Sequence, residues 1–96
     1  MALFCIVCSD NSGVLEKRVA TRPAHVEYLK TVMPVIRLAG PRMDDAGNGC
    51  GSMFVIDVAD RAAAEAFSAG DPFTSEGIFG KVDITAFNAT MGSWIA

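Results

Sequence analysis

The chain of 96 residues has few side chains that could carry chemistry. It contains a single histidine, His25, and three cysteines, an odd number. One histidine, without Cys, Asp or Glu clustered at ligand spacing, falls short of the three or four protein ligands of a metal site. No apolar run reaches the ~20 residues needed to cross a bilayer. We therefore expect neither a metal site nor a membrane span.

Charge is also sparse, at 20% of residues against roughly 25% in ordinary soluble domains. The net charge of −3 and the lack of a basic cluster argue against nucleic acid or an anionic membrane as a partner. Residues 2–8 lack the basic lead-in and cleavage site of a signal peptide, so we expect a cytoplasmic protein. A single domain, 1–96, with 51% hydrophobic residues should bury the excess against an identical copy.

Cys5 and Cys8 have the C-x-x-C spacing of redox motifs, but they fall inside a predicted strand. Three residues along a strand separate their Cα atoms by ~10 Å and place them on opposite faces. A disulfide tolerates about 7 Å at most. We therefore interpret both as small hydrophobic residues.

The first half of the chain predicts one strand, an interrupted helix and a second strand. Residues 2–8 are apolar on both faces, as in a strand covered on both sides. Helical spacing runs from 14 to about 33, but Pro23 lies inside it, so we expect a short helix over 14–20 and a main helix restarting at Pro23. After a strand at 35–39, the Gly-, Asp- and Asn-rich stretch 40–51 predicts a long, mobile hairpin connection.

The second half predicts a strand at 52–58, a helix at 61–69 with Asp60 as its N-cap and Gly70 as its terminator, and a strand at 81–87. The apolar tail, 88–96, is expected to dock on a partner or on the protein's own core. The order βαββαβ usually folds as an antiparallel sheet with both helices on one face, the ferredoxin-like α+β arrangement. Because the open face is apolar too, a second sheet should cover it and form a dimeric α+β barrel.

One titratable stripe stands out on the predicted helix. If the helical phase survives Pro23, Arg18 and Arg22 share a face with His25, which titrates near neutral pH. Asp71 follows the later helix and precedes a proline. Taken alone, a lone helical histidine is more often structural, and Asp-Pro more often starts a turn. From these residues alone, both a structural and a functional role stay open for His25 and Asp71.

Several short motifs resemble the YCII-related family of small bacterial proteins over nearly the whole chain, up to Phe87. They are Leu15-Glu16-Lys17-Arg18, Arg22-Pro23-Ala24-His25, Tyr28-Leu29, Ala39-Gly40-Pro41, Gly51-Ser52, Asp71-Pro72-Phe73 and Gly77-Ile78-Phe79. The resemblance implies a dimeric α+β barrel and a catalytic histidine–aspartate pair, here His25 and Asp71. The family is thought to include dehalogenating members.

An aspartate bonded to one ring nitrogen fixes the histidine tautomer and leaves the other nitrogen as a base. Phe73 and Phe79 could wall the site, and Arg18 could anchor a substrate carboxylate or phenolate. Tyr28 could be a core or a site residue. We expect a homodimeric enzyme without cofactor, of isomerase, lyase, dehalogenase or hydrolase type, acting on a small cyclic or aromatic metabolite. The alternative is a non-catalytic module that binds a small ligand.

Overall fold

Four antiparallel strands form a single sheet in the order β2-β3-β1-β4. The computed structural model describes residues 2–95. The strands are β1 (Ala2–Asp10), β2 (Ile36–Met43), β3 (Gly49–Val58) and β4 (Phe79–Phe87). The first strand lies between β3 and β4, pairing Ile6 with Phe54 on one side and with Ile84 on the other.

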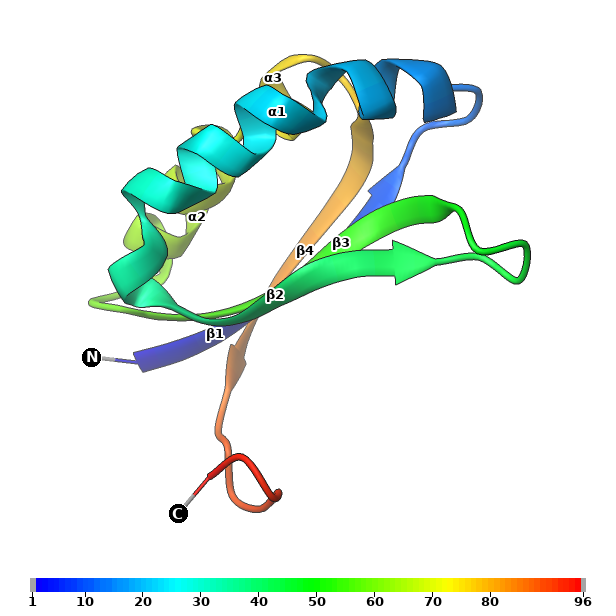
Figure 1. Cartoon of the computed structure of the whole chain (residues 1–96). Coiled ribbons are helices and arrows are strands. Elements are labelled where there is room, and N and C mark those ends of the chain that lie inside the picture. The colour runs from blue at the N-terminus through cyan, green and yellow to red at the C-terminus, as the bar shows by residue number, and fades with distance from the viewer. Residues whose placement is uncertain (1, 96) are drawn as a thin grey trace.

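The helices all lie on one face of this sheet (Figure 1). They are α1 (Leu15–Thr31), α2 (Arg61–Ala69) and the single turn α3 (Pro72–Ser75), with a short 3-10 turn, η1 (Met33–Val35), leading into β2. The predicted ferredoxin-like βαββαβ fold is therefore confirmed. None of the helices in residues 2–95 is long and apolar enough to span a bilayer.

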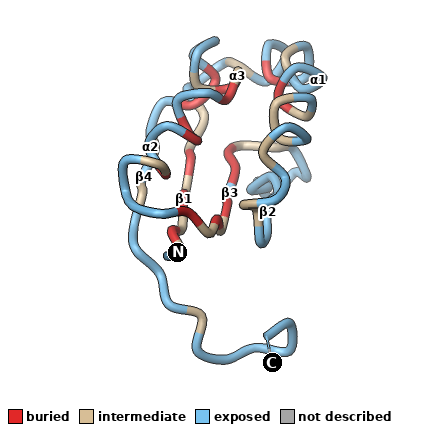
Figure 2. The backbone as a smooth tube through the Cα atoms, turned by 90° about the vertical axis from the view of Figure 1, so that its left-hand side faces the viewer, coloured by how far each residue is buried: buried red, intermediate tan, exposed pale blue. Residues whose placement is uncertain are grey.

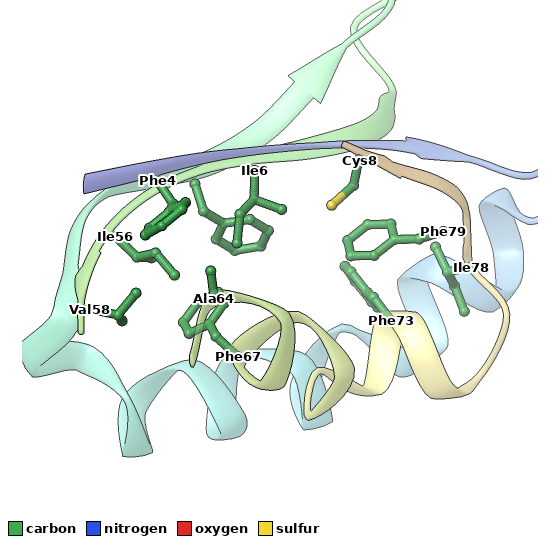
Figure 3. Close-up of a cluster of buried hydrophobic side chains, with 11 residues drawn as sticks. Phe4, Ile6, Cys8, Ile56, Val58, Ala64, Phe67, Phe73, Ile78 and Phe79 are labelled. Carbon is green, nitrogen blue, oxygen red and sulfur yellow. The ribbon is translucent and has the colours of Figure 1, made fainter. Parts of the chain in front are cut away.

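The core fills the space between the sheet and the helices (Figure 3). Because alternate strand residues point to opposite faces, one set of β1 and β3 side chains meets the helices. This set is buried together with Ala64, Phe67 and Phe73, and consists of Phe4, Ile6, Cys8, Phe54, Ile56 and Val58. The other set is only half-buried on β1, at Leu3, Cys5 and Val7. The sheet thus has one face covered by the helices and one open face, which is apolar along β1 and carries Asp57 and Asp83 on the neighbouring strands.

Two predicted boundaries were wrong in the first half of the chain. The helix is not interrupted at Pro23 but runs continuously through it. Pro23 is exposed, and the buried side chains of Arg18 and His25 hold the helix on either side, which offsets the missing proline N–H.

The hairpin connection is also shorter than predicted, because β2 and β3 extend to Met43 and Gly49. Only residues 44–48 link the strands. Asp44 Oδ1 accepts from the backbone N–H of Ala46 at 3.0 Å and of Asn48 at 2.9 Å. Gly47, with φ of 85°, supplies the left-handed conformation that the turn needs.

Both predicted caps of α2 lie where the sequence indicated. Asp60 accepts from the N–H of Ala63 at 2.9 Å, as an N-cap should. Gly70 ends the helix, but with φ of −75° rather than in a left-handed conformation. A Cβ at this position would lie 2.7 Å from the hydroxyl of Tyr28, so the glycine makes room for α1.

The C-terminal tail leaves the sheet after Phe87 and runs below its open face (Figure 2). Met91 and Trp94 are 87% and 83% exposed, so the described part of the tail does not dock on the protein's own core. Docking on a second copy stays a prediction.

Candidate functional site

The turn between α2 and α3 places a buried carboxylate beneath α1. Asp71 is the N-cap of α3, and its Oδ1 accepts from the N–H of Phe73 at 2.9 Å. Pro72 occupies the first helical position, where no backbone N–H is needed. Asp71 is only 1% exposed, so local chain geometry holds the carboxylate in one position.

The structure brings Asp71 and His25 together across 46 positions of sequence. The Nδ1 of His25 lies 2.7 Å from Oδ1 and 2.9 Å from Oδ2 of Asp71. A carboxylate accepts, so Nδ1–H donates and Nε2 carries the free lone pair of the neutral ring. Nε2 makes no hydrogen bond to any group within residues 2–95, and it is not fully buried. The second nitrogen is therefore accessible.

Two aromatic side chains fix the plane of the imidazole. Phe73 stacks on it, with ring centroids 3.9 Å apart and an interplanar angle of 7°. Phe54 approaches edge-on from β3 at 6.4 Å. The ring of His25 is thus held by a hydrogen bond at its edge and by a stacked phenyl ring at its face.

Arg18 reaches the same region, but its charge is already paired. Its Nη1 donates to both carboxylate oxygens of Asp10, at 2.8 and 2.9 Å. Its Nη2 donates to the carbonyl of Gly51 at 2.8 Å and to the hydroxyl of Ser52 at 3.3 Å. The guanidinium also lies 4.8 Å from the ring centroid of Phe73. Arg18 therefore braces α1 against β1, β3 and α3.

A cavity of about 420 Å³ lies between α1 and the β2–β3 hairpin. His25 and Phe73 form part of its wall, and α1 contributes the predicted stripe of Arg18, Arg22 and His25 together with Leu29. The hairpin contributes residues from both strands and from the turn: Ala39, Gly40, Pro41, Met43, Gly47, Asn48, Gly49, Ser52 and Phe54. The volume suits one small ring.

Phe79 and Tyr28 do not belong to this wall. Phe79 is buried on the far side of Phe73, with the two rings edge to face at 5.5 Å, so it is a core residue rather than a pocket wall. Tyr28 donates to the carbonyl of Phe67 at 2.7 Å and ties α1 to α2. Burial, followed by the charge of Asp71, raises the pKa of the Tyr28 phenol.

None of the three cysteines is among the residues that line this cavity. Cys8 is fully buried, and burial, with the nearby charges of Asp71 and Asp10, raises the pKa of its thiol to about 12. Cys5 lies on the opposite, open face, and all three cysteines are free thiols. Within residues 2–95, no group of three or more His, Cys, Asp or Glu could hold a metal ion.

Arg22 was not predicted as a site residue, although it belongs to the stripe. It lines the cavity and is exposed. Sequence spacing identified its face, but only the ion pair between Arg18 and Asp10 shows which of the two arginines is unpaired.

Comparison with known proteins gives matches that cover most of the chain. The model of the YCII-related domain matches residues 2–88. The protein YciI of Escherichia coli O6:H1 and that of Shigella flexneri are each 31% identical over 93 residues, which covers 88% of this chain and 95% of the relative.

Two solved structures are also similar to this chain. The 5-chloro-2-hydroxyhydroquinone dehydrochlorinase from Burkholderia phenoliruptrix, in complex with 2,5-dihydroxybenzoquinone, superposes with a TM-score of 0.84 at 26% identity. The match covers 92% of this chain and 95% of that one. An antibiotic biosynthesis monooxygenase superposes with a TM-score of 0.56 at 15% identity over 95% of this chain and all of the other, which shows a shared fold.

Proposed function

Because the chain belongs to the YCII-related domain family, we propose that it is an enzyme that moves protons on a small cyclic or aromatic compound. His25 is the acid/base residue and Asp71 is its partner. The observation that carries the proposal is the buried bond from His25 Nδ1 to Asp71, at 2.7 Å, with Nε2 left accessible in a ring-sized cavity. The fold of this family is that of dimeric α+β barrels.

With Asp71 beside it, His25 can both accept a proton and return it. Asp71 holds the tautomer in which Nε2 is unprotonated, so Nε2 accepts a proton from a ring hydroxyl or an acidic ring carbon. The imidazolium that forms is stabilised by the ionised Asp71 beside it. Nε2–H then returns the proton to another atom of the ring. Accepting a proton at one atom and returning it at another is an isomerisation.

An elimination follows when the ring bears a leaving group. Nε2 takes the proton of one hydroxyl and returns it to the chlorine-bearing carbon, which gives a keto tautomer. Loss of a second hydroxyl proton then drives its electron pair into the ring and expels chloride, leaving a quinone and HCl. The dehydrochlorinase of similar structure supports this choice of reaction, because its name describes loss of HCl from a chlorinated hydroxyhydroquinone.

The test substrate is therefore 5-chloro-2-hydroxyhydroquinone, with chloride release and quinone absorbance as the two measurements. His25→Gln and Asp71→Asn should each lower the rate by about 10²–10⁴-fold, the usual contribution of general acid–base catalysis. Asparagine also caps helices, so Asp71→Asn keeps α3 in place. Glu27→Gln is the control, because Glu27 is exposed on the same helix. Equal rates in all variants would refute the proposal.

A second candidate function is a non-catalytic module that binds a small ring. The many apolar side chains around the cavity favour it, since they would hold such a ring without any proton transfer. In that case the ring would bind to the Asp71→Asn variant as tightly as to the native protein and be recovered unchanged.

The open sheet face supports a homodimer. Its apolar side chains include Val7, Met53 and Val55, of which Met53 is 37% exposed. A second copy of the same sheet has the matching surface, and the dimer is proposed to be cytoplasmic. Val7→Asp should convert a species with the mass of two chains into one chain in sedimentation, whereas Ala62→Asp, on the exposed side of α2, should not. Equal masses for the two variants would contradict this interface.

Trp94 reports on whether the tail joins the same interface. It is the sole tryptophan, and it is 83% exposed in the single chain. If the tail docks on the second copy, Trp94 fluorescence should shift to longer wavelength on dilution to monomers. Unchanged emission would show that the tail stays free.

A further inference from the structure

Not every positive side chain around the cavity has a negatively charged partner. Three of its lining side chains, Arg18, Arg22 and His25, are cationic or can become so, and none of the described residues that line it is Asp or Glu. Arg18 is paired with Asp10, and His25 with Asp71. Arg22 has no ion pair or hydrogen bond to any residue in 2–95. One positive charge at the cavity is therefore left for a ligand.

Arg18 cannot take this role without breaking contacts that it already makes. Its two terminal nitrogens bind Asp10, the carbonyl of Gly51 and the hydroxyl of Ser52, and the residue is only 7% exposed. Turning it toward a ligand would leave Asp10 as an unpaired, nearly buried carboxylate. Arg22, by contrast, is exposed and can orient toward a ligand at no such cost.

The spacing of Arg22 and His25 matches the size of a small ring. They are three residues apart on one continuous helix, so their Cβ atoms lie about 5–6 Å from each other. Pro23 lies between them on the helix, and its ring fixes φ at that position. An anionic group held by Arg22 would thus keep the rest of the ligand within reach of Nε2.

We propose that Arg22 anchors a planar oxyanion on the ligand, either a ring carboxylate or an ionised ring hydroxyl. The guanidinium presents a planar fork that binds two oxygens of a carboxylate at once, or one ring oxyanion. This inference rests on the proposed function, because it assigns the substrate class of the same cavity: a small aromatic or cyclic acid. It also transfers to Arg22 the anchoring role predicted for Arg18.

The test compares a charged probe with its neutral isostere. Benzoate and benzamide are titrated into the native protein, and binding is followed by NMR through the ring signals of His25, which are unique because the chain has no other histidine. Benzoate should bind more tightly than benzamide. Arg22→Gln should weaken benzoate binding roughly 10- to 100-fold, as expected for loss of a charge-assisted hydrogen bond, and leave benzamide within about twofold.

Two further variants separate the anchor from a general charge effect. Lys17→Gln removes one positive charge from the exposed surface of the same helix, away from the cavity lining, and should change neither affinity appreciably. Arg22→Lys keeps the charge but loses the planar fork, so it should fall between native and Arg22→Gln. The anchor is refuted if native protein does not prefer benzoate, or if Arg22→Gln acts no differently from Lys17→Gln.

A second pair of probes distinguishes the two sources of the oxyanion. 4-Nitrophenolate, at a pH where its hydroxyl is ionised, is compared with 4-nitroanisole. A larger Arg22 dependence for nitrophenolate than for benzoate would identify an ionised ring hydroxyl, and the reverse would identify a ring carboxylate. All these measurements are of binding, so loss of the anchor would leave the His25-dependent turnover standing, and failed turnover would leave the anchor standing.

Discussion

The imidazole of His25 lies flat on the phenyl ring of Phe73, with centroids 3.9 Å apart and planes 7° from parallel. Phe73 follows two positions after Asp71, the hydrogen-bond partner of the same imidazole. One short segment at the start of α3 thus holds both the edge and the face of the ring. The orientation of Nε2 in the cavity follows from these two contacts.

Replacing Phe73 by leucine should keep the core filled while removing the stacked surface. We expect a loss of stability that includes the about 0.5–1.5 kcal/mol of an aromatic pair, and a slower proposed reaction. Phe79→Leu is the matched control, because it also loses the edge-to-face contact but leaves the stack on His25 intact. Urea unfolding and turnover measure the two effects. A rate loss as large in Phe79→Leu would show that the stack is not what matters.

Removing the partner of Arg18 should be costly. Asp10 and Arg18 have side chains only 8% and 9% exposed, so Asp10→Asn leaves a nearly buried guanidinium without its counter-charge. We expect a loss of about 3 kcal/mol in the free energy of unfolding, at the lower end for a broken buried pair because asparagine still accepts a hydrogen bond. The double variant Asp10→Leu with Arg18→Met should lose much less. A cost below about 1 kcal/mol for Asp10→Asn would mean that the pair behaves like an exposed one.

Cys8 should resist thiol reagents in the folded protein. With a pKa of about 12, its thiolate is present in only about one molecule in 10⁴ at pH 8, and the side chain is fully buried. Cys5 and Cys50 are both half-buried and should be labelled before Cys8. Mass spectrometry after brief treatment with iodoacetamide gives the order, and urea should abolish the difference. Early labelling of Cys8 without urea would contradict its burial.

Tyr28→Phe should cost about 0.5–1.5 kcal/mol at neutral pH, the net value of the hydrogen bond to Phe67. The native pKa of Tyr28 is raised above the unfolded value of about 10, so the unfolded chain loses this proton first. The resulting stability is fully present below pH 10 and is lost as pH rises through the native pKa. Urea unfolding at pH 8 and pH 10.5 should therefore show a smaller difference between native protein and Tyr28→Phe at the higher pH. Cys8 is common to both proteins and cancels. A difference that grows with pH would contradict the direction of the shift.

Periodicity and turn chemistry predicted most of the fold. The apolar run of residues 2–8 and the cap at Asp60 are recognised by local rules, and the structure confirms the element order and the sheet that they imply. Pro23 misled the prediction because its cost is local, whereas the compensation comes from Arg18 and His25 packing on distant elements. The strand ends at Met43 and Gly49 were missed because cross-strand pairing, rather than residue type, extends them.

The candidate site was predictable only in part for the same reason. The R-x-x-H and Asp-Pro motifs indicated His25 and Asp71, and the structure places these two side chains in contact. The ion pair of Arg18 depends on Asp10, a residue at the end of β1 that no helical pattern links to it. The position of Phe79 behind Phe73 likewise depends on tertiary packing. Residue spacing predicts neither the ion pair of Arg18 nor the contact between Phe79 and Phe73.

Two walls of the cavity differ in how firmly they are packed against the core. One wall carries His25 and Phe73, which are locked into α1, α3 and the sheet. The facing wall includes Met43, Gly47 and Asn48, which are exposed around a turn closed by the side chain of Asp44. Under the proposed function, a library confined to the hairpin tip could therefore change which small ring the cavity accepts while His25 and Asp71 stay untouched. On that proposal, the hairpin tip is a recognition loop carried by a separate, rigid scaffold.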